Sequence, residues 1–329
     1  MDLRLEQLER WLGETLRLKY SSIAPASSDA SFRRYFRIIV DGDSFVVMDA
    51  PPEKENCAPF IKVSNTMLDF GLNVPRVLKR DLENGFLLLT DLGSEQYLPH
   101  LNEQSVDALY SDAINALVNL QAQGDEESDE LPLYNHTRLM SELELFREWF
   151  IGQHLGIDLD ATQEKLIDDT FEWLITSALE QPQVWVHRDF HSRNLMVCNE
   201  NSPGILDFQD AVVGAASYDL VSLLKDCYIV WPRERVEYWV TEYRAKALRA
   251  GISGIEDPEK LLHWFDAMGV QRHIKVLGIF CRLNIRDGKS VYMDDIPRVF
   301  DYVMDACERL PQLLEFKRFL EKVVVPRMA

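Results

Sequence analysis

The sequence predicts an α+β protein with a small, sheet-rich N-terminal part and a larger, mainly helical C-terminal part. Residues 33–40 and 44–50 are rich in aromatic and β-branched residues, and Asp41-Gly42-Asp43 between them favours a hairpin turn. Beyond Asp91, apolar residues recur at helical spacing over most of the chain. A short β-rich island within residues 184–207 interrupts these helices. Together these observations define the fold class.

The elements before residue 92 follow in the order helix, two strands, helix and two short strands. Apolar residues within residues 3–18 have the spacing of an amphipathic helix. Pro51-Pro52 ends the second strand because proline cannot donate to the ladder. The second helix ends at Gly71, a residue that tolerates the backbone conformation of a helix C-cap. The two short strands are expected near residues 74–78 and 86–89.

The C-terminal part begins with a helix whose apolar positions start at Val106 and which ends at Gly124. Ser141 and Glu144 have the spacing of a capping box, so we expect a further helix to begin there. Residues 162–179 predict another long helix.

Composition and charge restrict the classes of partner. The chain of 329 residues carries 35 basic and 54 acidic side chains, a net charge of −19, which disfavours nucleic acid and anionic lipid. No run of eighteen apolar residues predicts a membrane span. The 5 cysteines are dispersed, as is typical of a reducing cytoplasm. We therefore expect a cytoplasmic protein whose partners are small molecules.

The β-rich island holds the residues that favour phosphoryl transfer. A loop after the strand at Val186 contains Asp189, which could accept a proton from an attacking hydroxyl. Asn194 and Asp207 offer the oxygen ligands that Mg²⁺ prefers, and hairpin pairing of their strands would bring them together. His187 is expected to brace the loop by hydrogen bonding. The alternative is a polar turn whose side chains only cap backbone groups.

These residues carry a resemblance to a known family. His187-Arg188-Asp189 with Asn194, followed by Asp207, resembles the protein-kinase-like fold, and more closely the aminoglycoside phosphotransferase and choline kinase superfamily. The resemblance implies ATP and Mg²⁺ as cofactors. It also implies two lobes, with residues 1–92 binding the nucleotide and residues 93–329 carrying catalysis and the acceptor.

Two further stretches resemble the same family. Residues 87–93 are similar to its interlobe hinge, whose backbone near Asp91 would meet the adenine. Asp219, within Ser217-Tyr218-Asp219-Leu220, resembles a structural aspartate that braces the catalytic loop. The resemblance covers nearly the whole chain.

A narrower resemblance indicates the acceptor. Residues 47–53 and 271–278 are similar to a branch of bacterial kinases that phosphorylate the anomeric (C1) hydroxyl of N-acetylmuramate and N-acetylglucosamine in peptidoglycan recycling. This likeness implies a sugar 1-phosphate as product. A downstream nucleotidyltransferase would use it, linked by the pathway rather than by binding.

The sequence departs from the family pattern at two places in the nucleotide site. Met48 stands where kinases of this fold carry a strand lysine for the phosphates, and residues 26–31 replace the glycine-rich loop. Within this loop, Ser28 is expected to approach the nucleotide. Another cation must replace the lysine, and three arginines follow the loop. Alternation places Arg33 and Arg37 on one face and Arg34 on the other, and Arg34 is our first choice.

The acceptor side has fewer signals. Arg272 and His273 are candidates for binding the substrate, since a carboxylate-bearing sugar such as muramic acid favours a cation. Aromatic residues that could contact a sugar ring are Trp185, Tyr218, Trp231 and Trp264.

Two other functions are compatible with the sequence. One is a kinase of another small alcohol, either an aminoglycoside or an amino alcohol, whose cationic groups would suit an acidic protein. The other is a nucleotide-binding pseudokinase that works as a scaffold, a hypothesis that Met48 motivates. The presence of Asp189, Asn194 and Asp207 together disfavours the scaffold.

Overall fold

The computed structural model describes residues 2–27, 32–124 and 131–328. The chain divides into two compact units. The first unit combines Met1–Asn102 with Arg193–Asp210, and the second combines Glu103–Ser192 with Ala211–Ala329. Ser28, which is expected to approach the nucleotide, lies outside the described residues.

A five-stranded antiparallel sheet forms the centre of the first unit, with strand order β1-β2-β3-β5-β4. Its strands are β1 (Tyr20–Ser27), β2 (Arg34–Val40), β3 (Asp43–Asp49), β4 (Val77–Asp81) and β5 (Phe86–Thr90). Strands β2, β3 and β5 confirm the sequence prediction, whereas β4 begins at Val77, three residues after the expected start. Strand β1 was not predicted, because it contains a proline and several small residues. Its place at the edge of the sheet tolerates that proline.

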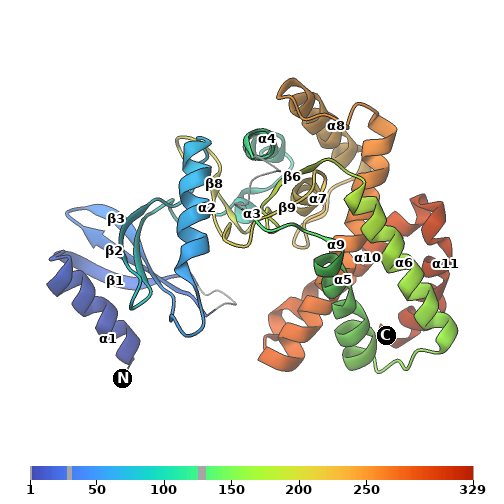
Figure 1. Ribbon diagram of the computed structural model, residues 1–329, viewed down its shortest axis with the longest axis horizontal. Coiled ribbons are helices and arrows are strands. Elements are labelled where there is room, and N and C mark those ends of the chain that lie inside the picture. The colour runs from blue at the N-terminus through green and yellow to red at the C-terminus, as the bar shows by residue number, and fades with distance from the viewer. Residues whose placement is uncertain (1, 28–31, 125–130, 329) are drawn as a thin grey trace. The chain divides into compact units, whose positions relative to one another are not determined.

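Two helices pack on the sheet from opposite sides (Figure 1). Helix α1 (Leu3–Arg10) continues as a wider π-helical turn over Trp11–Thr15, which confirms the amphipathic helix expected here. Its buried residues form a core with the side chains of one sheet face: Leu8, Trp11, Leu12, Phe36, Ile38, Val47, Phe86 and Leu88. Helix α2 (Cys57–Asp69) ends before Gly71, whose φ of +78° matches the predicted C-terminal glycine.

Three smaller elements complete the first unit. Helix α3 (Tyr97–His100) follows β5, and strands β7 (Leu195–Met196) and β8 (Gly204–Ile205) pair as a small antiparallel hairpin. Phe208, just after β8, packs on Phe60 of α2 with the ring centroids 4.8 Å apart. This contact places the hairpin against α2 of the same unit.

The second unit is mainly helical. Its elements are α4 (Val106–Gln123), α5 (His136–Leu145), a π-helical continuation (Phe146–His154), α6 (Ala161–Leu179), α7 (Tyr218–Leu224), α8 (Arg233–Arg249), α9 (Pro258–Asp287), α10 (Ile296–Arg309), α11 (Leu314–Phe319) and α12 (Val325–Met328). Strands β6 (Gln183–Val186) and β9 (Val212–Ala215) pair antiparallel among them. Helix ends predicted at Gly124 and Leu179 are confirmed.

The capping box predicted at Ser141 is wrong. Helix α5 begins five residues earlier, at His136, where the Asn135 side chain accepts the N–H of Arg138 at 3.1 Å. Ser141 lies inside the helix and donates its hydroxyl to the carbonyl of Arg138 at 2.8 Å. Asparagine is at least as good an N-cap as serine, and the helix starts at the earlier cap.

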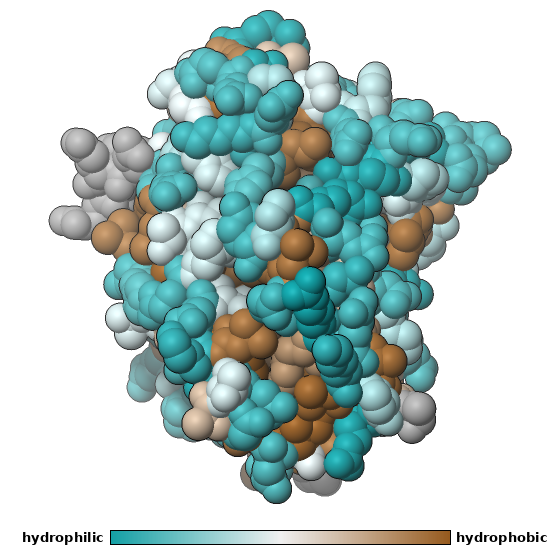
Figure 2. Space-filling view, turned by 90° about the vertical axis from the view of Figure 1, so that its right-hand side faces the viewer, coloured by the Kyte–Doolittle hydropathy of each residue, from teal (hydrophilic) through white to brown (hydrophobic). Residues whose placement is uncertain are grey.

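One face of the surface is mainly hydrophilic (Figure 2). Figure 2 shows one face on which hydrophilic residues predominate and hydrophobic residues form small, separate patches. Over the described residues, no helix is both long enough and apolar enough to span a membrane.

Helix α9 is the central helix of the second unit and is buried over most of its length. At Gly278 it passes so close to the end of α5 that an added Cβ would lie 2.3 Å from the backbone carbon of Leu145. Backbone atoms cannot yield as a flexible side chain can, so only glycine fits there.

We expect Gly278→Ala to lower the free energy of unfolding by about 1–3 kcal/mol, the usual cost of overpacking a core. Gly269→Ala on the same helix is the matched control, because its Cβ would meet only the Lys225 side chain, no closer than 3.6 Å. Urea unfolding of both variants measures the difference. Equal stability of the two variants would contradict the close approach of α9 and α5.

Candidate active site

The loop of residues 187–194 connects β6 to β7 and is held at its start by a buried carboxylate. Asp219, in the first turn of α7, is fully buried. One of its oxygens accepts the backbone N–H of His187 at 2.6 Å, and the other accepts that of Arg188 at 2.9 Å. Burial raises the pKa of Asp219 to about 7, and the two N–H donors act in the opposite direction. Through these two hydrogen bonds Asp219 fixes the backbone at the start of the loop.

Two further hydrogen bonds fix the path of this loop. The buried ring of His187 accepts the N–H of Asp189 through Nδ1 at 3.2 Å. Asp226, two residues after the end of α7, accepts the N–H of Ser192 at 2.9 Å and also its hydroxyl. Sequence reasoning missed Asp226, because no local pattern distinguishes it from other acidic residues. Asp219 and Asp226 thus hold the two ends of the loop segment from residue 187 to residue 192.

Asp189 is half-buried and is surrounded by positive charge. Burial alone would raise its pKa, but the charges of nearby cations outweigh burial and hold the pKa below its ordinary value. These cations are Lys275, His191, Arg272 and Arg188. A carboxylate that stays ionised at neutral pH can receive a hydrogen bond, and then a proton, from a substrate hydroxyl.

Two of the cations beside Asp189 are balanced by one half-buried acid, Glu142 of α5. Lys275 of α9 contacts Glu142 at 3.0 Å and donates to the hydroxyl of Tyr218 at 3.0 Å. Arg188 pairs with the other oxygen of Glu142. The charges of Lys275 and Arg188 lower the pKa of Glu142 against the effect of its burial. Sequence reasoning did not single out Glu142, which lies inside an ordinary amphipathic helix.

Asn194 and Asp207 lie together in the first unit, as the predicted hairpin pairing requires. Leu195 pairs with Ile205, and the N–H of Leu206 donates to the carbonyl of Asn194 at 2.9 Å. Asp207 directly follows in the left-handed region with φ +63°. An amide oxygen and a carboxylate are suitable ligands for Mg²⁺, which normally takes its other ligands from water and phosphate. Accordingly, the described residues contain no group of three or more His, Cys, Asp or Glu that could hold a metal alone.

Asp91 at the predicted hinge has a side chain occupied by local contacts. It binds the guanidinium of Arg37 at 2.5 and 3.0 Å, and it accepts the N–H of Gly93 at 3.0 Å. These contacts lower its pKa against the effect of burial. The side chain therefore shapes the hinge, and the expected contact between hinge backbone and adenine stays a prediction.

Arg272 and His273, both on α9, have different surroundings. Arg272 is buried, donates to the sulfur of Cys227 at 3.4 Å and is one of the cations that lower the pKa of Asp189. The buried His273 ring lies 2.8 Å from the carbonyl of Lys225 and stacks on Tyr302. Burial, followed by the charge of Arg272, lowers the pKa of His273 to about 3. Arg272 thus contributes positive charge near Asp189, whereas the contacts of His273 are those of a core residue.

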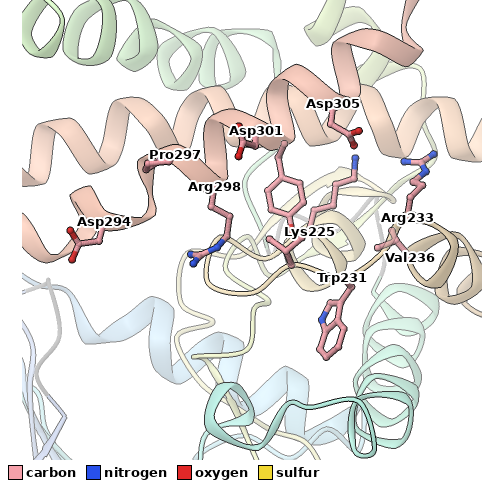
Figure 3. A pocket seen from close by; sticks show the side chains of 11 residues that line it. Lys225, Trp231, Arg233, Val236, Asp294, Pro297, Arg298, Asp301 and Asp305 are labelled. Atoms are coloured by element: carbon pink, nitrogen blue, oxygen red, sulfur yellow. The ribbon is translucent and has the colours of Figure 1, made fainter. Parts of the chain in front are cut away.

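A cavity of about 590 Å³ lies in the second unit between α10 and residues 225–236. Figure 3 shows Trp231 with basic and acidic side chains around the cavity, among them Arg233, Arg298 and Asp301. This lining suits a polar molecule with an apolar face. Of the aromatic residues considered for sugar contact, Trp231 lines the cavity, whereas the other three are buried in the core: Trp185, Tyr218 and Trp264.

We expect Asp219→Asn to loosen the loop. The amide keeps the size of the carboxylate but turns an NH₂ group toward one of the two backbone N–H donors, which removes a charged hydrogen bond worth about 1.5–3 kcal/mol. The free energy of unfolding should fall by that order. Asp158→Asn, an exposed substitution in the same unit, is the control. A variant as stable as wild type would contradict the bracing role of Asp219.

The chain has clear sequence relatives. The model of a family described as "Phosphotransferase enzyme family" matches residues 22–261. A protein from Pseudomonas putida named N-acetylmuramate/N-acetylglucosamine kinase is 44% identical over 332 residues, covering 98% of this chain and 97% of the relative. A protein of the same name from Neisseria meningitidis serogroup B is 42% identical, with coverage of 97% and 95%.

Solved structures resemble the fold. Spectinomycin phosphotransferase APH(9)-Ia, in complex with ADP and spectinomycin, has a TM-score of 0.66 at 13% identity, with 93% of this chain and 98% of that chain covered. Choline kinase LicA from Streptococcus pneumoniae has a TM-score of 0.62 at 13% identity, with coverage of 92% and 99%. These similarities confirm the predicted protein-kinase-like fold, with its β-rich N-terminal and helical C-terminal parts. The chain therefore belongs to the phosphotransferase enzyme family.

Proposed function

We propose that this protein is an ATP-dependent sugar kinase that phosphorylates the anomeric hydroxyl of N-acetylmuramate and N-acetylglucosamine. The observation that carries the proposal is the likeness, over 98% of the chain, to a kinase named for these two sugars. The surroundings of Asp189 support it, because an ionised carboxylate among fixed cations suits proton acceptance from a hydroxyl. The aminoglycoside phosphotransferase structures, at 18% identity or less, support the fold and not an antibiotic as acceptor.

In this proposal Asp189 orients the sugar hydroxyl and accepts its proton as the bond to phosphorus forms. Asn194 and Asp207 would hold Mg²⁺, which neutralises charge on the phosphates. Residues 1–92 would hold most of the nucleotide, with the adenine at the hinge backbone near Asp91. Ser28 would approach the nucleotide, and residues 93–329 would hold the sugar and the catalytic loop.

Arg272 is our candidate for recognising the acceptor. Its guanidinium belongs to the set of charges around Asp189, and it is almost fully buried, so it would meet a substrate group without competition from bulk water. The carboxylate of muramate and the carbonyl of an N-acetyl group both accept hydrogen bonds from arginine. The product, a sugar 1-phosphate in the cytoplasm, would be consumed by a nucleotidyltransferase.

Asp189→Asn should lower kcat by about 10²–10⁴-fold, the usual contribution of a general base, because an amide cannot accept the proton. MgATP affinity should change much less, since the base acts on the acceptor. Asp158→Asn, exposed in the same unit, is the matched control and should keep wild-type turnover. Turnover by Asp189→Asn near the wild-type rate would refute the assignment.

The position of the new phosphate tests the reaction itself. An anomeric phosphate is a hemiacetal ester, so the product from N-acetylglucosamine should release phosphate in mild acid and resist alkali. The methyl glycoside of N-acetylglucosamine, whose anomeric oxygen is blocked, should not be phosphorylated. An acid-stable product, or phosphorylation of the methyl glycoside, would contradict transfer to C1.

A further inference from the structure

The nucleotide site lacks the lysine that kinases of this fold place on β3. Met48 occupies that position and is 1% exposed, so it cannot neutralise a phosphate. In the β2–β3 register Met48 pairs with Tyr35, whereas Asp49 pairs with Arg34. Paired residues of antiparallel strands point to the same face, so Met48 and Arg34 face opposite sides of the sheet.

Arg34, our first choice from the sequence, is committed to the face that α1 covers. Its guanidinium donates to Asp49 at 2.6 and 3.0 Å and also pairs with Asp2 at the start of α1. Arg4 of α1 binds the same Asp49, which is fully buried. Arg34 therefore serves to join α1 to the sheet. The contacts argue against Arg34 as the replacement for the lysine.

Arg37 is also committed elsewhere, because it pairs with Asp91 and donates to the carbonyl of Gly93 at 2.7 Å. Arg33 lies near two other acids, Asp207 and Glu55. One guanidinium nitrogen lies 3.7 Å from a carboxylate oxygen of Asp207, and another lies 4.0 Å from Glu55, just before α2. The Arg33 side chain is 11% exposed, in a setting that strengthens its electrostatic interactions.

The contacts of Arg33 parallel those of the missing lysine. In kinases of this fold the lysine pairs with a helix glutamate and binds the phosphates beside the metal. Here one cation lies between Glu55 and Asp207, the carboxylate proposed to hold Mg²⁺. Both carboxylates lie within ion-pair distance of the guanidinium, so Arg33 brings its positive charge beside the proposed Mg²⁺ ligand.

We infer that Arg33 supplies the cation that binds the phosphates of ATP in place of the strand lysine, with Glu55 as the acid that positions it. The inference rests on the proposed function as a kinase. Arginine suits this role because its planar guanidinium binds phosphate oxygens in pairs. Met48 is then free to be an apolar core residue.

Equilibrium binding tests this inference without turnover. Isothermal titration calorimetry would compare MgATP with adenosine, which has no phosphate. Arg33→Ala should weaken MgATP binding about 10- to 100-fold, as expected for the loss of a charged hydrogen bond, and leave adenosine binding within about twofold. Arg33→Lys, which keeps the charge, should recover part of the MgATP affinity.

Two other variants are controls. Arg80→Ala removes an exposed cation from β4 of the same unit and should leave both affinities unchanged. Arg34→Ala should lower the melting temperature while keeping the ratio of MgATP to adenosine affinity. The inference is overturned by wild-type MgATP affinity in Arg33→Ala, or by an equal loss of MgATP and adenosine binding, which indicates a structural role.

The same experiments separate this inference from the proposed function. Binding of MgATP that depends on Arg33, in a protein that phosphorylates neither sugar, would refute the proposed acceptor and retain the role of Arg33. Normal sugar kinase activity together with wild-type MgATP binding by Arg33→Ala would retain the function and refute the role.

Discussion

The bond between the Asp219 carboxylate and two successive backbone N–H groups is the interaction on which the candidate site depends. A loop that carries a reactive side chain must hold that side chain in one place, although its own backbone lacks the regular hydrogen bonds of a strand or helix. Asp219 satisfies the N–H groups of His187 and Arg188 immediately before Asp189. Those bonds offset part of the cost of burying this carboxylate, and they fix the backbone just before Asp189.

Charged residues of the second unit surround Asp189, the residue that follows these two N–H groups. Arg188, Arg272 and Lys275 bring positive charge to Asp189, and Glu142 balances two of them. A buried cluster of this kind contributes little net stability, because each charge loses its hydration. Its consequence is electrostatic: burial raises the pKa of Asp189, and the charges of the cluster outweigh burial and hold the pKa below its ordinary value. The residues come from α5, α9 and the loop itself, so the charge around Asp189 depends on the packing of these two helices against the loop.

Local sequence patterns predicted most strands and the candidate residues of the loop. They did not predict contacts between residues that are distant in the chain. The strands β2 to β5, the hairpin turn and the positions of Asp189, Asn194 and Asp207 follow from short-range patterns. Strand β1 escaped prediction because its proline and small residues have weak strand preference. Pairing with β2 and the packing of Tyr20 and Ile23 against the core stabilise it. Asp226 and Glu142 escaped because a carboxylate becomes significant only through partners distant in the chain. Alternation separated Arg34 from Arg33 and Arg37 correctly, yet it could not tell which face α1 would cover.

The close approach of α9 to the backbone of Leu145 also restricts how this protein could change its substrate during evolution. Gly278 lies on the same helix as Arg272 and Lys275, about two turns and one turn further along. Any side chain at residue 278 would push α9 away from α5 and displace both cations together. In the proposed kinase, substitutions of individual side chains on α9 could alter the acceptor site locally, whereas a shift of the whole helix would disturb the environment of Asp189 at the same time.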